Sequence, residues 1–231
     1  MNENPTALHY AVQQPSVKGV SKPPLLMLLH GYGSNEHDLM GLAPYLDPRL
    51  LIVSVRAPRA LDFGGYGWFP IEITDKGIVL HFSEAFEACD QVSTLAAWVA
   101  REHSADPACT ILLGFSQGAS ISVAVALREP RKFAAVAALS GRCVPEMIPE
   151  HPDDVEGLPV FMTHGEFDQV IPIAQGRASH EMMGQLPLDL TYTEYAMGHE
   201  INQASLQDVR SWLTDQIDRF QQSATEPSSP A

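Results

Sequence analysis

The amino-acid sequence predicts one α/β domain, in which a mostly parallel β-sheet is covered by helices on both faces. Strand-like and helix-like patterns alternate along almost the whole chain, as is typical of parallel sheets with helical crossovers. The strand-like runs Leu25–His30 and Leu50–Val55 are continuously apolar, as expected of strands buried on both faces. In such folds ligands bind at the carboxyl ends of the strands, so functional residues are expected in the loops that follow them.

Local signals indicate each element of the first half. Asn35 is predicted to cap a helix, Ala57-Pro58 stops the strand before it, and Ser83 stands before an acidic helical turn. The predicted elements are, in order, an edge strand at Leu8–Val12, a loop at Pro15–Pro24, the strand Leu25–His30, a helix from Asn35 to about Leu46, the strand Leu50–Val55, a Gly- and aromatic-rich loop at Phe63–Pro70, and a helix at Ser83–His103.

The second half repeats the alternation. A Pro- and acid-rich segment, Val144–Gly157, is predicted to be a loop or a short cap. The short connection between Arg142 and Gly157 is expected to give an open, shallow site with a minimal lid. The other predicted elements are, in order, a strand leading to Phe115, a helix at Ala119–Leu127, strands at Phe133–Leu139 and Leu158–Gly165, a helix at Ile173–Gln185, an alternating strand at Leu188–Tyr195 and a helix at Asn202–Phe220. The domain is predicted to span residues 1–222, and the Ser/Pro-rich Ser223–Ala231 to be a disordered tail.

Composition and charge exclude several classes of function. The 231 residues suffice for one large domain, and 45% hydrophobic and 18% charged residues are typical of a globular protein. The net charge of −14 argues against nucleic acid as a partner. No apolar run reaches the roughly 20 residues of a membrane span, so stable membrane insertion is not expected. With no signal peptide, and with Cys89, Cys109 and Cys143 predicted to be reduced core thiols, we expect a cytoplasmic protein.

The segment Ile111–Ser120 carries the strongest chemical signal. An apolar strand-like run leads into Gly114-Phe115-Ser116-Gln117-Gly118, and an apolar helix-like run comes next. A serine held between a strand and a helix by two glycines is typical of a nucleophile elbow, because a side chain at either glycine would clash with its surroundings. The pattern predicts that Ser116 is exposed at the carboxyl edge of the sheet.

A serine hydroxyl needs an adjacent base, which a carboxylate orients, and these partners are expected to follow it in the order acid, then histidine. His199 is the candidate base, because it lies between the last strand and the last helix. Asp168 is the candidate acid, in the loop after the strand that ends at Gly165. His164 precedes any suitable acid and is predicted to be structural, while Glu166 is predicted to be a solvated or supporting carboxylate.

Two backbone N–H groups are expected to stabilise negative charge on the substrate oxygen. One is predicted to come from Gln117, directly after the serine, and the other from Tyr32 in the loop His30-Gly31-Tyr32-Gly33. No motif for a metal or a phosphate-bearing cofactor is found, so neither a metal nor a cofactor is predicted.

These motifs together resemble the phospholipase/carboxylesterase family of α/β-hydrolases, which includes acyl-protein thioesterases and small bacterial carboxylesterases. The motifs are Leu29-His30-Gly31-Tyr32-Gly33, Trp68-Phe69, Gly114-Phe115-Ser116-Gln117-Gly118-Ala119, His164-Gly165-x-x-Asp168 and Gly198-His199-Glu200. The resemblance implies an α/β-hydrolase fold, Ser116, Asp168 and His199 as catalytic residues, and Tyr32 and Gln117 as oxyanion donors. It also implies that Trp68 and Phe69 bind substrate, although Pro70 replaces the aspartate that members often carry.

The resulting prediction is a serine hydrolase that cleaves carboxylic esters or thioesters through an acyl-enzyme on Ser116. A lysophospholipase or acyl-protein thioesterase is an alternative. So is a lactonase similar to dienelactone hydrolases, although members of that group usually carry cysteine at the elbow. A catalytically silent hydrolase fold that acts as a binding module is the remaining alternative. The expected partner is a small ester or acyl substrate, and the resemblance implies a possible homodimer.

Overall fold

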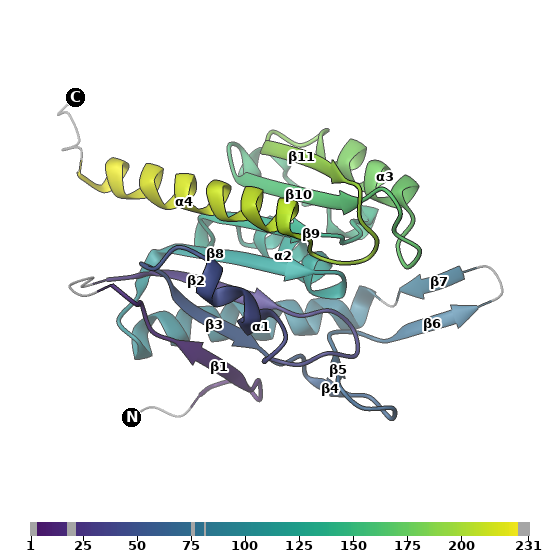
Figure 1. Ribbon diagram of the computed structural model, residues 1–231, viewed down its shortest axis with the longest axis horizontal. Helices are drawn as coiled ribbons and strands as arrows, with labels where there is room; N and C mark the ends of the chain where they lie inside the picture. The colour runs from purple at the N-terminus through teal and green to yellow at the C-terminus, as the bar shows by residue number, and fades with distance from the viewer. Residues whose placement is uncertain (1–3, 18–21, 75–76, 81, 226–231) are drawn as a thin grey trace.

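The fold is built on one seven-stranded sheet with the strand order β1-β3-β2-β8-β9-β10-β11 (Figure 1). The computed structural model describes residues 4–17, 22–74, 77–80 and 82–225. β1 runs antiparallel to β3, and the other neighbours in the sheet are parallel. The predicted mostly parallel α/β sheet is confirmed. The strands are β1 (Tyr10–Gln13), β2 (Pro24–Leu29), β3 (Leu51–Val55), β8 (Asp106–Phe115), β9 (Ala135–Leu139), β10 (Pro159–Gly165) and β11 (Asp189–Tyr195).

Helices cover both faces of the sheet, as the continuously apolar strands predict. Successive side chains of a strand point to opposite faces, so Leu25, Met27 and Leu29 of β2 join one core cluster and Leu26 and Leu28 join the other. The first cluster includes residues of α1 (Phe82–Glu102), α2 (Gln117–Arg128) and α3 (Ile173–Met183). The second includes residues of α4 (Gln203–Thr225) and the 3-10 helix η1 (Leu39–Tyr45), which lie on the near face in Figure 1.

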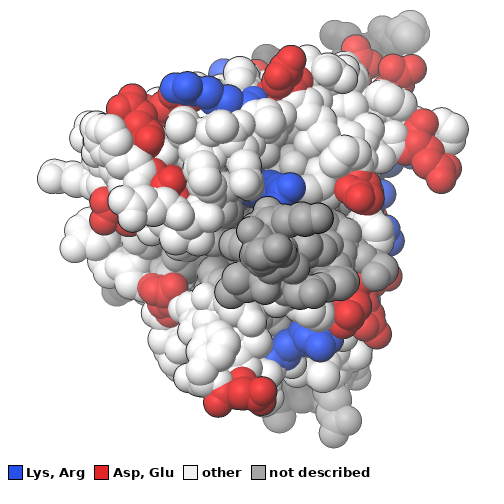
Figure 2. Space-filling view, turned by 90° about the vertical axis from the view of Figure 1, so that its right-hand side faces the viewer, with Lys and Arg blue, Asp and Glu red and all other residues white. Residues whose placement is uncertain are grey.

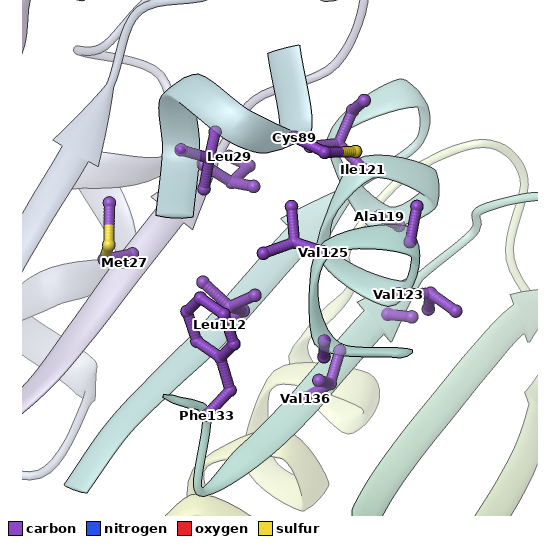
Figure 3. Packing of buried hydrophobic residues seen from close by; sticks show 14 of the residues in the cluster. Met27, Leu29, Cys89, Leu112, Ala119, Ile121, Val123, Val125, Phe133 and Val136 are labelled. Carbon is purple, nitrogen blue, oxygen red and sulfur yellow. The ribbon is translucent and has the colours of Figure 1, made fainter. Parts of the chain in front are cut away.

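Helix α2 is buried along almost its whole length. Ile121 and Val125 lie in the same cluster as Leu29 and Leu112 of the sheet, and Cys89 of α1 belongs to it too (Figure 3). Burying each such aliphatic side chain stabilises the fold by roughly 1.5–3 kcal/mol. The helix that begins directly after Ser116 is therefore a rigid support for that residue.

The helix predicted from Asn35 to about Leu46 is wrong. The structure has only the seven-residue 3-10 helix η1, and the Asn35 side chain accepts a hydrogen bond from the His37 peptide N–H at 2.9 Å, in a local turn. Asparagine competes with helix formation through such turns. Pro44 lies inside η1 and lacks the N–H that a longer α-helical ladder would need.

The segment after β3 contains more strand than predicted. The short strand β5 (Tyr66–Gly67) lies within the predicted Phe63–Pro70 loop and pairs with β4 (Arg59–Ala60), which precedes it. A hairpin of β6 (Ile71–Thr74) and β7 (Gly77–Leu80) comes next and projects beyond the carboxyl edge of the sheet (Figure 1).

Other boundaries differ more modestly. Helix α1 begins at Phe82, so Ser83 lies inside the helix. Helix α4 continues to Thr225, so the prediction of disorder is wrong for residues 223–225, and residues 226–231 lie outside the described residues. Residues 18–21 of the predicted Pro15–Pro24 loop also lie outside them. The remaining elements are short 3-10 turns, η2 (Pro130–Lys132), η3 (Pro145–Met147) and η4 (Pro152–Val155).

Two further observations concern the described residues only. None of their helices is long and apolar enough to cross a membrane. Cys89, Cys109 and Cys143 are free and buried, and burial raises the pKa of each thiol to about 12, so these thiols remain protonated at neutral pH.

Leu213 tests the packing of α4 on the sheet. Its side chain is fully buried in the second cluster, so Leu213→Ala is expected to lower the free energy of unfolding by about 2–5 kcal/mol in a urea titration. Gln207→Ala, at an exposed position of the same helix, is the control and is expected to change it by less than about 0.5 kcal/mol. Equal, small effects of the two substitutions would contradict this packing.

Candidate active site

Ser116 lies at the sharp turn between β8 and α2. Its φ of 54° and ψ of −117° are unfavourable for a residue with a side chain. Tight packing fixes the turn: a Cβ on Gly114 would lie 2.2 Å from the Gly118 carbonyl oxygen, and one on Gly118 would lie 2.0 Å from the Leu29 carbonyl oxygen. The Ser116 N–H also donates to the Leu139 carbonyl at 2.9 Å. The two glycines are therefore required by close backbone approach, as the sequence predicts.

Ser116, His199 and Asp168 form one hydrogen-bonded chain. The distance from His199 Nε2 to Ser116 Oγ is 2.8 Å, and that from His199 Nδ1 to Asp168 Oδ2 is 2.7 Å. The His199 ring packs beside that of Phe115, with centroids 4.9 Å apart. Since the Asp168 carboxylate accepts a hydrogen bond from the protonated Nδ1 of His199, the unprotonated Nε2 is left to accept a hydrogen bond from the serine hydroxyl.

The loops after β10 and β11 approach closely, and this brings acid and histidine together. The Glu166 N–H donates to Tyr195 O at 2.8 Å, and the Phe167 N–H to Met197 O at 3.0 Å. A Cβ on Gly165 would lie 2.2 Å from the Gly198 carbonyl oxygen. Only glycine fits this contact, so Gly165 is a positioning residue that sequence reasoning did not single out, although it stands in the quoted His164-Gly165 motif.

Asp168, and not Glu166, faces His199. The Asp168 side chain is fully buried, whereas Glu166 is exposed. Its other oxygen, Oδ1, accepts hydrogen bonds from the N–H groups of Val170 and Ile171, both at 2.8 Å. The buried His164 ring holds the same loop, because its Nε2 donates to the Ile171 carbonyl at 2.7 Å. The structural role predicted for His164 agrees with this contact.

A buried network holds the loop that contains Tyr32. His30 Nε2 accepts a hydrogen bond from the Ala57 N–H at 3.0 Å, so its Nδ1 carries the proton and donates to Gly31 O at 2.7 Å. The Trp68 indole N–H donates to His30 O at 2.8 Å. Burial lowers the pKa of His30, which keeps the ring neutral.

The Gln117 side chain joins this network to the elbow. Its Oε1 accepts the Trp68 N–H and its Nε2 donates to Phe69 O, both at 2.7 Å. This role of the side chain was not predicted, because it depends on a segment 49 residues away in sequence. The Gln117 N–H is the first of α2, where helix geometry offers no acceptor. Among the described residues, neither this N–H nor that of Tyr32 has an acceptor within the protein.

A cavity of about 690 Å³ opens beside Ser116, and its wall is mostly apolar. The described lining residues come from six segments of the chain near the carboxyl edge of the sheet; they are Gly31, Tyr32, Phe63, Phe69, Ile71, Phe115, Ser116, Gln117, Ser120, Arg142, Gln169, Val170, Ile171, Pro172, Gln175 and His199. Figure 2 shows this edge of the sheet, with Asp and Glu scattered over it and Lys and Arg in few places.

Of the two aromatic residues predicted to bind substrate, only one lines the cavity. Phe69 lines it, whereas Trp68 is not a lining residue and is buried behind the Tyr32 loop. The buried Trp68 therefore supports the Tyr32 loop from behind through its bond to His30. No residue of the predicted loop Val144–Gly157 lines the cavity, in keeping with a minimal lid. In the described ranges, no group of His, Cys, Asp and Glu has a metal-binding arrangement.

A comparison with known families decides what kind of protein carries this site. A model of the phospholipase/carboxylesterase family matches residues 9–217. The chain belongs to this family. It is an ester hydrolase by family membership, as the sequence predicts, and its sheet and covering helices form the α/β-hydrolase fold.

Individual relatives agree with the family. The chain is 26% identical over 200 residues to MhqD of Bacillus subtilis, named as a hydrolase, with 84% of this chain and 94% of that protein covered. It is 27% identical over 208 residues to acyl-protein thioesterase 1 of Saccharomyces cerevisiae, covering 81% and 90%. Among solved structures, esterase PE8 is similar with a TM-score of 0.74 and 27% identity, covering 90% of this chain and 98% of that one.

The neutral, buried His30 predicts a specific pH dependence of stability. Its pKa in the folded protein is lowered, so as pH falls through the unfolded-state value of about 6.5 the unfolded chain takes up the proton first. The contribution of neutral His30 to the free energy of unfolding is thus complete above that pH. It is lost progressively as the pH falls from there towards the lower pKa of the folded state. His30→Gln is expected to lose less unfolding free energy than the wild type between pH 7.5 and 5.5, in urea titrations at each pH. Identical slopes for the two proteins would refute this assignment.

Proposed function

We propose that this protein is a serine hydrolase that cleaves carboxylic esters or thioesters through an acyl-enzyme on Ser116. The observation that supports this most directly is the hydrogen-bonded chain from Asp168 through His199 to Ser116, with contacts of 2.7 and 2.8 Å. That chain has the order and the geometry that a nucleophile, a base and an orienting acid require.

In the proposed mechanism, Ser116 Oγ attacks the carbonyl carbon while His199 Nε2 takes the hydroxyl proton. Asp168 holds the tautomer with the proton on Nδ1 and stabilises the imidazolium that forms. The tetrahedral intermediate formed by the attack then expels the alcohol or thiol, which receives the proton from His199. In the second half, His199 takes a proton from water, which attacks the acyl carbon of the acyl-enzyme. The bond from that carbon to Ser116 Oγ then breaks, His199 returns the proton to Oγ, and the carboxylic acid is released.

The negative oxygen of the tetrahedral intermediate is proposed to bind the N–H groups of Tyr32 and Gln117. Both residues line the cavity beside Ser116, and a helix N-terminus such as that of α2 favours negative charge. Each donor of this kind contributes about 3 kcal/mol to the transition state. The His30 and Trp68 contacts keep the Tyr32 loop in place, so they act on the reaction through position.

The remaining candidate functions differ in the natural substrate of the enzyme. The cavity of about 690 Å³ and its apolar wall suit a small ester or acyl group. A lysophospholipase or acyl-protein thioesterase is the second candidate, favoured by the similarity to the yeast protein with the latter name. The serine at the elbow argues against the lactonase alternative, and the complete hydrogen-bonded chain argues against a silent binding module.

The proposal extends to the setting of the enzyme. We propose a cytoplasmic protein with one catalytic domain that includes the whole of α4 to Thr225, a small-molecule ester or acyl substrate, no cofactor and no nucleic-acid partner. The net charge of −14 and the reduced, buried cysteines support this setting. A homodimer is proposed from family analogy alone.

Covalent labelling tests the nucleophile. Wild-type protein is expected to react with a fluorescent fluorophosphonate and to appear as one labelled band on a gel, because the probe forms a bond to an activated serine. Ser116→Ala is expected to remain unlabelled, while Ser122→Ala, which changes another buried serine of α2, serves as the control and keeps the label. Equal labelling of wild type and Ser116→Ala would disprove the proposed nucleophile.

The acid can be identified by comparing two isosteric changes. Asp168→Asn is expected to lower kcat for a 4-nitrophenyl ester by about 10⁴-fold, since the amide favours the wrong His199 tautomer. Glu166→Gln, on the exposed neighbour, is expected to keep kcat within about twofold. Circular dichroism establishes that both variants fold. A near-normal Asp168→Asn together with an inactive Glu166→Gln would reverse the assignment.

A further inference from the structure

Arg142 gives the cavity wall a positive charge. Among the described residues that line the cavity it is the one permanently charged side chain, and no aspartate or glutamate accompanies it. The rest of the wall is mostly apolar, apart from Ser116, His199 and a few amide and hydroxyl groups. The proposed hydrolysis steps give Arg142 no role.

The guanidinium of Arg142 has no partner in the part of the chain that the structure describes. Several other arginines have carboxylate partners, for example Arg49 with Asp47, Arg56 with Glu36 and Arg177 with Glu194. No salt bridge or side-chain hydrogen bond joins the Arg142 guanidinium to a described residue. Because the chain has 28 acidic against 14 basic residues, partners are abundant elsewhere. The cavity therefore holds an arginine that the protein leaves available.

The backbone that carries Arg142 is fixed relative to Ser116. Ser120, one turn further along α2, donates from its Oγ to Arg142 O at 2.7 Å and accepts from Arg142 N at 3.2 Å. Gly141 lies so close to α2 that a Cβ on it would be 2.6 Å from that of Ala119.

The residues flanking this segment are held as well. The Ser140 N–H donates to Thr163 O at 2.8 Å, and the Cys143 N–H to Ser179 Oγ at 2.9 Å. Ser140 adopts a φ of 50°, a conformation that side chains disfavour and that persists only where the surroundings impose it. The base of the Arg142 side chain is thus anchored to the helix that positions the nucleophile.

We propose that Arg142 binds a carboxylate of the substrate, so that the enzyme prefers esters or thioesters that carry a free carboxylate in their acyl or alcohol part. This inference rests on the proposed function of Ser116. A guanidinium matches a carboxylate through two parallel hydrogen bonds, and the apolar wall strengthens the attraction. Arg142 would then determine specificity by fixing the end of the substrate remote from the carbonyl carbon.

Two substrate pairs test this inference and locate the carboxylate. The acyl pair is mono(4-nitrophenyl) glutarate and neutral 4-nitrophenyl pentanoate. The alcohol pair is 4-acetoxybenzoate and its neutral methyl ester. The measured quantity is the ratio of kcat/KM for the anionic over the neutral member, in wild type and in Arg142→Gln. Comparing the ratio between proteins cancels the intrinsic reactivity of the esters.

In Arg142→Gln the ratio is expected to fall about 10- to 100-fold for one pair, which identifies the side of the ester that carries the carboxylate. Arg210→Gln is the control: it removes the same charge from the exposed surface of α4, on the other face of the sheet, and is expected to keep the wild-type ratio. An unchanged ratio for both pairs, in a protein that hydrolyses the neutral esters, overturns the inference and leaves the proposed function intact. Absence of neutral-ester hydrolysis and of Ser116 labelling would instead overturn the proposed function.

A measurement on the wild type covers the case in which Arg142→Gln does not fold. Glutarate is expected to inhibit hydrolysis of 4-nitrophenyl pentanoate competitively, at a concentration at least 10-fold lower than neutral glutaramide does, because only the diacid pairs with Arg142. Arg142→Lys keeps the charge without the two-pronged geometry and is expected to retain an intermediate preference. Equal inhibition by glutarate and glutaramide would argue against a carboxylate site.

Discussion

The close packing of the start of α2 against β2 and β8 is the constraint on which the site depends. Gly118 lies against the Leu29 carbonyl and Gly114 against the Gly118 carbonyl, at distances that exclude any side chain. This packing holds Ser116 in a conformation that costs about 1–3 kcal/mol. The burial of α2 offsets that cost, because nearly every residue of the helix contributes to the core. The core thus stabilises a half-buried serine whose own backbone conformation is unfavourable.

The sequence predicted those parts of the site that depend on local patterns. Apolar runs that alternate with helical patterns predicted the sheet and its covered faces, since periodicity and burial are expressed in neighbouring residues. The spacing of Gly114, Ser116 and Gly118 predicted the elbow. The positions of Asp168 and His199 could be anticipated because both come after strands, and the ends of parallel strands meet at one edge of a sheet. The structure brings these side chains within hydrogen-bond distance.

Several features were not predicted, some because local signals conflict and one because it depends on a contact distant in sequence. The local signal of Asn35 favoured a helix, but its side chain forms a turn, and the segment that contains Pro44 forms only a short 3-10 helix. The alternation of apolar Ile71 and Ile73 with polar residues is typical of a strand. It indicates the β6 strand, but the prediction did not include a hairpin there. The sequence predicted Trp68 near the site but not its position behind the Tyr32 loop. That position depends on the hydrogen bond from its indole N–H to His30 O, 38 residues away in sequence.

Gln117 contributes to the site through both its backbone and its side chain. Its backbone begins α2 beside the nucleophile, while its side-chain amide grips the Trp68–Phe69 backbone through one donor and one acceptor. A glutamate in its place would turn the donor into a second acceptor facing the Phe69 carbonyl, and a leucine would satisfy neither group. Substitutions that change the Phe69 side of the cavity are therefore expected to preserve the Gln117 amide. Differences in substrate preference are expected to arise more readily from cavity residues that do not contact this amide.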